Sequence, residues 1–274
     1  MADADTLKDA AQDASDSAPM GWAARVGLAA RGVVYLLMGW LAILVALGSN
    51  KHIDQRGALT EVLDQPFGSA LVVLMALGFA AYALWRLSEA AFGVTGERDG
   101  AGPRLKSLAR GLAYLALTWT AISLLRGARG TQADQQGQLA ADVMAHSYGR
   151  WLVGLAGVVL VGVGLMMVHE GWSDRFLRYF GALPPGLRRS VIWLGRIGTV
   201  SRGVVFAITG VLVVIAAWRA DPDQAGGIDA AFRTLLEQPF GPALVALLGV
   251  GLLLFGVYGL AEAAWRRVPD GTRQ

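Results

Sequence analysis

Three arginines and three glutamates lie at the edges of long apolar segments, where ionisable side chains are costly. Each Arg is followed by Gly and opens an apolar run, and each Glu closes the apolar run that comes next. The separations from Arg to Glu are 58, 60 and 60 residues, so the chain contains three copies nearly in register. Ionisable side chains inside a membrane pair with one another or form proton, ion and ligand sites. The candidate polar cluster is Arg31, Glu89, Arg110, Glu170, Arg202 and Glu262.

The two charges of one copy are expected to lie at the same membrane depth. Adjacent helices of a hairpin are antiparallel, so we expect Arg31 to pair with Glu89. The corresponding pairs are Arg110–Glu170 and Arg202–Glu262. Two interpretations remain open. Either the pairs are buried clasps that fix helix register, or the six side chains converge near a pseudo-threefold axis and bind a small ion, a proton or a lipid headgroup. A secondary basic set, six residues before each Arg, is Arg25, Arg104 and Arg196.

These side chains must be positioned by helices that cross a membrane. A helix needs about 20 apolar residues to cross the hydrocarbon, and six runs are long enough without a charge in the middle. Strands of a membrane barrel would alternate in polarity over about ten residues, and these runs do not. We therefore predict an all-α integral membrane protein. Its spans are expected at 28–48, 68–91, 107–125, 150–169, 199–218 and 241–263.

The composition agrees with a membrane protein and excludes several kinds of site. Of the 274 residues, 54% are hydrophobic and only 16% are charged, whereas soluble domains carry about 25% charged residues. The absence of Cys excludes disulfide frameworks and thiol nucleophiles. The pI of 9.4 would suit a nucleic-acid partner, but the positive charges lie at helix ends, so we reject nucleic acid and expect membrane lipid as the partner. We predict no metal, no cofactor and no enzymatic activity, because no nucleophile–base motif occurs.

The three copies predict the domain organisation. Three helical hairpins occupy residues 21–98, 99–174 and 188–268, between an acidic disordered tail at 1–20 and a short tail at 269–274. Because every repeat has two spans, all three share one orientation around an axis along the membrane normal. Small residues on the first span of each repeat are expected to allow close helix packing. They are Gly32, Gly39, Gly111, Gly203 and Gly210.

The loops between paired spans carry a second recurring pattern. Residues 65–68 and 238–241 both read Gln-Pro-Phe-Gly, and the segment before each has apolar residues at helical spacing. We expect short amphipathic helices at 58–63 and 228–236, lying at the interface. Each Pro is expected in the first turn of the following span, where a missing N–H costs nothing.

The distribution of Lys and Arg predicts the orientation. The termini and the loops on one side carry 17 of the 24 basic residues. Positive charge collects on the cytoplasmic side, so both termini are expected in the cytoplasm. The preference for Arg over Lys, 21 to 3, fits a GC-rich bacterial coding background. The expected location is therefore the bacterial inner membrane, with the first span as an uncleaved anchor.

The Arg-Gly-Val-Val-Tyr opening at residues 31–35, the three hairpins and the recurring Glu resemble the bacterial membrane family known as domain of unknown function 1206. The resemblance covers residues 22–268, and three copies match in order. It implies six spans in three paired repeats and no particular activity. The second copy departs at residues 146–148, where His-Ser-Tyr replaces Gln-Pro-Phe. We expect a non-enzymatic membrane module, and the sequence identifies no protein partner.

Overall fold

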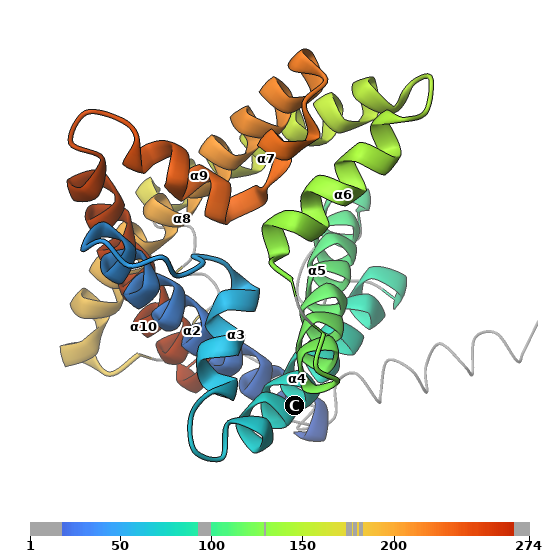
Figure 1. Ribbon diagram of the computed structural model, residues 1–274. Helices are drawn as coiled ribbons and strands as arrows, with labels where there is room; N and C mark the ends of the chain where they lie inside the picture. The colour runs from blue at the N-terminus through green and yellow to red at the C-terminus, as the bar shows by residue number, and fades with distance from the viewer. Residues whose placement is uncertain are drawn as a thin grey trace, which may run out of the picture. The chain divides into compact units, whose positions relative to one another are not determined.

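The computed structural model describes residues 18–92, 100–128, 130–173, 177, 180 and 183–265, and it contains helices but no β-strand in these residues (Figure 1). Residues 1–17 and 269–274, predicted as tails, lie outside the described residues. In chain order the elements are α2 (Ala18–Ala46), α3 (Gln55–Leu63), α4 (Gly68–Phe92), α5 (Ala101–Leu125), α6 (Gln132–Met144), α7 (Gly149–Trp172), α8 (Pro185–Arg219), the 3₁₀ turn η2 (Pro222–Ala225), α9 (Gly227–Leu236) and α10 (Gly241–Trp265).

Six of these helices have the length and apolar character of membrane spans. They are α2, α4, α5, α7, α8 and α10, and the mean hydropathy of their most apolar windows lies between 1.4 and 2.4. The prediction of an all-α fold with six spans is confirmed, and the protein is a multi-pass membrane protein. The pseudo-threefold axis and the repeat boundaries stay predictions.

Three spans begin earlier than their apolar runs. Helix α2 begins at Ala18 instead of 28, and α5 begins at Ala101 instead of 107. Helix α8 begins at Pro185, although apolar residues alone predicted a start at 199. Pro185 occupies a first-turn position of α8, where proline fits because the first N–H groups of a helix have no partner within it. The first turns of α5 and α8 are polar and precede the apolar run, so a search for apolar runs does not detect them.

The loops between paired spans each contain a short helix. The two short helices predicted in the first and third copies are present as α3 and α9, and their location at the membrane interface stays a prediction. The second copy has α6 at the same place. A capping box starts α6: the Thr131 hydroxyl accepts from the Asp134 N–H, and the Asp134 carboxylate accepts from the Thr131 N–H.

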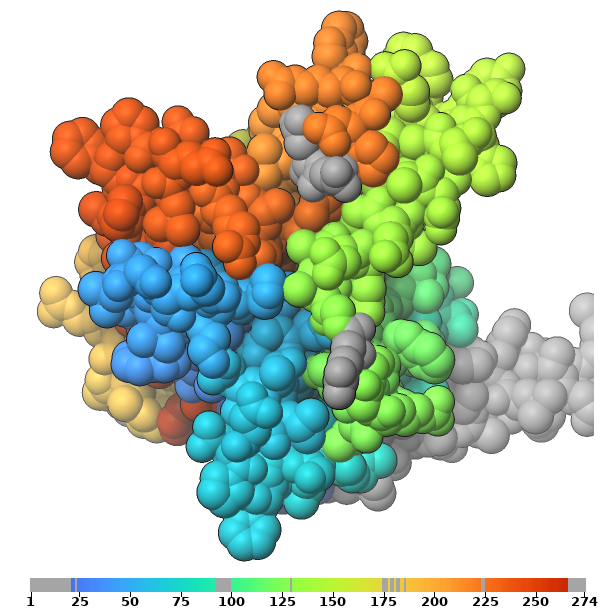
Figure 2. All heavy atoms as spheres, in the orientation of Figure 1, coloured from blue at the N-terminus to red at the C-terminus, as the bar shows by residue number. Residues whose placement is uncertain are grey.

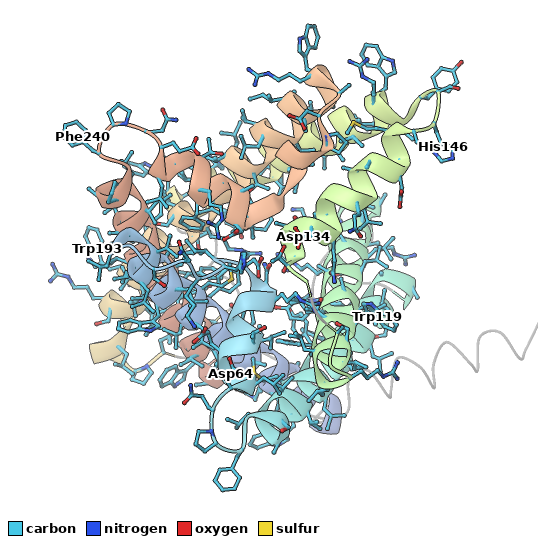
Figure 3. All side chains as sticks on the ribbon, in the orientation of Figure 1. Asp64, Trp119, Asp134, His146, Trp193 and Phe240 are labelled. Carbon is cyan, nitrogen blue, oxygen red and sulfur yellow. The ribbon has the colours of Figure 1, made fainter. Side chains whose placement is uncertain are left out.

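The placement of the two Gln-Pro-Phe-Gly prolines was wrong. Helices α4 and α10 begin at Gly68 and Gly241, two residues after the prolines. The intervening Phe67 and Phe240 have φ of 63° and 60°, in the left-handed region that large side chains rarely adopt. This conformation interrupts the helix before each span. Phe240, labelled in Figure 3, points away from the ribbon at the tip of its turn and is 85% exposed.

The chain divides into two compact units. The first contains the residues up to Arg31, Val62–Gly127 and the residues from Gly259 onward, and the second contains Gly32–Glu61 and Ala128–Tyr258. Helices α4 and α5 pack together in the first unit, and α7 and α8 pack together in the second. Each unit therefore combines segments from more than one repeat.

Glycines set the close packing of the spans. A Cβ on Gly164 of α7 would lie 2.6 Å from the carbonyl oxygen of Gly203 on α8, and a Cβ on Gly39 of α2 would lie 2.6 Å from that of Gly249 on α10. A Cβ on Gly111 would lie 2.8 Å from the Leu87 side chain. Gly210 and Gly32 make equivalent approaches to α7 and α10. These contacts join three helix pairs, α2 with α10, α5 with α4, and α8 with α7. In each pair the first span of one repeat contacts the last span of another repeat.

Candidate functional site

A buried ion pair joins the first and last spanning helices within the first unit. The Arg31 Nη2 atom of α2 donates to the Glu262 Oε2 atom of α10 at 2.5 Å. The two side chains are 14% and 5% exposed, so the pair is largely removed from water. Arg25, two turns earlier on α2, donates to the carbonyl oxygens of Ala263 and Ala264 at the end of α10. These bonds satisfy orphan carbonyls of a helix end.

The expected pairing of Arg31 with Glu89 was wrong. The two helices of the hairpin do bring both residues into the same unit. Gly39, eight residues after Arg31, packs against α10, whereas Gly27, four residues before Arg31 on the same helix face, packs against Tyr82 of α4. Helix α2 therefore contacts both α4 and α10, and the Arg31 guanidinium reaches the Glu262 carboxylate. The clasp forms between repeats and not within a hairpin.

Glu89 is held by two other partners. Arg86, one turn earlier on α4, donates from Nη1 to Glu89 Oε2 at 2.6 Å, and Ser107 of α5 donates to the same oxygen at 3.0 Å. Arg86 also donates from Nε and Nη2 to the Tyr82 hydroxyl at 2.9 and 2.8 Å. Its guanidinium lies 4.4 Å from the centroid of the Trp85 ring. The spacing of three residues between Arg86 and Glu89 is the sequence signal that would have predicted this pair.

The carboxylates of this first unit are therefore compensated by arginines. Arg86, Glu89 and Glu262 are 3%, 6% and 4% exposed. Buried charges persist where they are paired and hydrogen-bonded. The geometry suits a structural lock more than a reaction centre, because both carboxylates are already held by Arg.

The arginine of the third copy has an aromatic environment. The Arg202 guanidinium of α8 lies 5.0 Å from the ring centroids of Tyr35 and Phe255 and 5.1 Å from that of Phe206. Its Nε atom is buried, and no residue in the described part of the chain accepts a hydrogen bond from it. Such cation–π contacts are worth about 2 kcal/mol when desolvated.

The remaining candidates are placed as follows. Arg110 on α5 and Glu170 on α7 are half-buried and lie in different units, as do Arg202 and Glu262, so these two predicted pairs stay predictions. Of the secondary basic set, Arg25 is described above, and Arg196 lies 5.5 Å from the Trp193 ring centroid. Arg104 is half-buried on α5.

A second polar cluster in the loops was missed from the sequence. The loop cluster, within the second unit, is His52, Asp54, Arg56, Gln132, Asp229 and Arg233. The Gln132 amide accepts from the Arg56 N–H at 3.2 Å and donates to the Gln55 side chain at 3.1 Å. Arg56 is 3% exposed and donates from Nη2 to the Ala128 carbonyl at 2.7 Å. One segment from each repeat thus meets in this cluster.

Asp229 on α9 is the most heavily bonded member of the loop cluster. Its Oδ1 accepts from the Ile53 N–H at 2.7 Å, and its Oδ2 accepts from Arg233 Nε at 2.7 Å and lies 3.2 Å from His52 Nδ1. Figure 2 shows the blue residues near 50 directly beside the orange residues of α9. The bonded residues are separated by 176 positions in sequence, so no local pattern predicts the contact.

Comparisons with known proteins agree with the repeat pattern. The model of the family Domain of Unknown Function (DUF1206) matches three times, at residues 26–93, 105–174 and 197–266. The uncharacterized protein YxxB of Bacillus subtilis (strain 168) is 28% identical over 251 residues, which cover 89% of this chain and 90% of that protein. Neither match names an enzymatic activity, and no solved structure matches. With three successive matches over most of its length, the chain belongs to the Domain of Unknown Function (DUF1206) family.

Proposed function

We propose that this protein is a non-enzymatic membrane module of the bacterial inner membrane, with both termini in the cytoplasm and with Arg–Glu pairs that lock its helices. The observation that carries this proposal is the Arg31–Glu262 pair between α2 and α10. The two charges neutralise each other at the contact between the first and last repeats. A scaffold requires a fixed helix arrangement of this kind, whereas acid–base chemistry requires a carboxyl that is free to exchange a proton.

The proposed orientation rests on the 17 of 24 basic residues assigned to one side. Since the chain has no Cys, single Cys residues can be placed one at a time in the segments 50–56, 130–138 and 220–227. Membrane-impermeant maleimide should label all three in intact spheroplasts. A Cys at Ala101, which is exposed at the other end of a span, is the matched control and should be labelled only after lysis. If the three loops are labelled only after lysis, the proposed orientation is wrong and both termini lie outside the cytoplasm.

Purified protein in vesicles tests the absence of conduction. We expect proton and monovalent-ion leakage equal to that of protein-free vesicles. Glu262→Gln and Glu89→Gln should leave leakage unchanged but lower the unfolding temperature. If the wild type conducts ions and either substitution abolishes this flux, the glutamates form a conduction site and the structural interpretation is wrong.

Lipid-headgroup binding is the second candidate, and Arg202 favours it. Its Nε atom has no hydrogen-bond acceptor among the described residues, and a guanidinium binds phosphate through paired N–H groups. Arg202→Gln should weaken retention of phosphatidylglycerol in native mass spectrometry. Arg219→Gln, at the C-terminal end of the same helix, is the control. Equal retention in wild type and Arg202→Gln would remove this candidate.

A further inference from the structure

Asp54 is a buried carboxyl with one oxygen that no described residue satisfies. It lies directly before α3 and is 2% exposed. Its Oδ1 accepts from the Gly57 N–H at 2.7 Å and thereby caps α3. Its Oδ2 is buried, and no donor in the described part of the chain reaches it. Burying a carboxylate oxygen that has no hydrogen-bond donor costs free energy. Protonation removes the negative charge, so burial favours the neutral acid.

A second carboxylate beside Asp54 takes the available donors. Asp229 is also 2% exposed, and it binds the Ile53 N–H and the Arg233 guanidinium. Arg56 is buried, but its Nη2 donates to Ala128. None of the donors of the described residues forms a hydrogen bond with Asp54 Oδ2. The titratable and charged groups contributed by the surrounding segments are Lys51, His52, Arg56, Asp134, Asp229 and Arg233.

We propose that Asp54 is a proton-binding site that holds the segment 49–57 against α9. The ligand is a single proton from the surrounding solution, carried on Oδ2. With the proton bound, the cluster buries one carboxylate, Asp229, with its own Arg and N–H partners. When the proton leaves, a second negative charge remains beside Asp229 without a donor. Repulsion between the two carboxylates then weakens the junction between the first and third loops.

The electrostatics of the cluster agree with this geometry. Burial, together with the negative charge of Asp229, raises the pKa of Asp54, and the Gly57 N–H, His52 and the Arg56 N–H oppose this rise only in part. The folded state therefore keeps a proton that the unfolded chain has lost. The stabilisation is complete below the ordinary aspartate pKa and is lost as the pH rises through the raised pKa.

Infrared spectroscopy of the full protein in detergent tests whether Asp54 carries the proton. An ordinary aspartate loses its proton at a pH of about 4. In a pH titration we expect the wild type to keep a carbonyl band of a buried protonated carboxyl above the pH at which an ordinary aspartate ionises, and we expect Asp54→Asn to lack this band. Asp64→Asn is the matched control, because Asp64 is an exposed aspartate directly after α3 (Figure 3). Absence of the band in the wild type, or its persistence in Asp54→Asn, would overturn the proposal.

The Asn variant should fold, because Asn is as good a helix N-cap as Asp. Its amide oxygen can still accept from Gly57, and its NH₂ group replaces the acid O–H. The unfolding temperature of the wild type should fall as the pH rises above the ordinary aspartate pKa and through the raised pKa of Asp54, and that of Asp54→Asn should change less. Asp229→Asn removes the neighbouring charge, so the carboxyl band of Asp54 should titrate at lower pH than in the wild type. Identical pH profiles for wild type and Asp54→Asn, or a band that titrates at the same pH in Asp229→Asn, would contradict the proton-binding site.

Discussion

Removing either partner of the Arg31–Glu262 pair should leave the other as an uncompensated, largely buried charge. Breaking a fully buried pair costs about 3–5 kcal/mol. Because Arg31 is 14% exposed and Glu262 is 5% exposed, we expect Glu262→Gln and Arg31→Gln each to cost about 2–4 kcal/mol of unfolding free energy. In the double variant neither charge remains alone, so its cost should fall below the sum by about 1–3 kcal/mol.

The assay is a double-mutant cycle on unfolding free energy in detergent, measured where unfolding is reversible. The matched control is Lys51–Glu61, which has the same 2.5 Å separation but side chains that are 48% and 28% exposed. Its coupling should be about 0–1 kcal/mol. A cycle on Arg31 with Glu89 should show weaker coupling than the cycle on Arg31 with Glu262, because Glu89 is bonded to Arg86 and Ser107. Additivity for Arg31 with Glu262, together with coupling for Arg31 with Glu89, would refute the packing of α2 against α10.

Three further substitutions test separate contacts, each by unfolding free energy. Gly164→Ala should cost about 1–3 kcal/mol, because the new Cβ would meet the backbone of α8 at 2.6 Å. Its control, Gly162→Ala, has open space around it and should be neutral or stabilising by up to about 1 kcal/mol. Equal costs for the two variants would contradict the helix contact. Phe240→Gly should stabilise by about 1 kcal/mol by removing a left-handed Phe that is 85% exposed, and a lower stability would mean that the ring itself contributes. Ser107→Ala should cost about 1–3 kcal/mol, because it removes a buried 3.0 Å bond to the Glu89 carboxylate, and a neutral result would assign that bond no role.

The spans could be predicted because each depends on a local property. An apolar run of sufficient length specifies a crossing helix whatever its neighbours are. The start of α8 at Pro185 lay outside this signal, since its first turns are polar. Phe67 and Phe240 show a different limit: the Pro-Phe-Gly sequence marks a turn, but the left-handed φ of Phe depends on how the chain enters the following helix.

The partners of the charged residues could be predicted only in part. Spacing identified Arg31 and Glu262 as ionisable residues near span ends, and antiparallel packing placed such residues at one depth. The choice between Glu89 and Glu262 depends on how α2 packs against both α4 and α10, and no local sequence pattern specifies this packing. Asp54 and Asp229 were missed altogether, because they belong to the connections of different repeats and become a site only when these connections meet.

The bond between Arg31 and Glu262 spans 231 positions of the chain, and this has a consequence for biosynthesis. Translation proceeds from the amino terminus, so Arg31 enters the membrane long before its acidic partner has been made. Until α10 is inserted, the nascent protein carries an unneutralised guanidinium in its first span. Completion of the last helix removes this defect, so the salt bridge distinguishes a finished polypeptide from a truncated one. A ribosomal product that stops before α10 should be less stable than the loss of one helix contact alone implies, and a better substrate for membrane proteolysis.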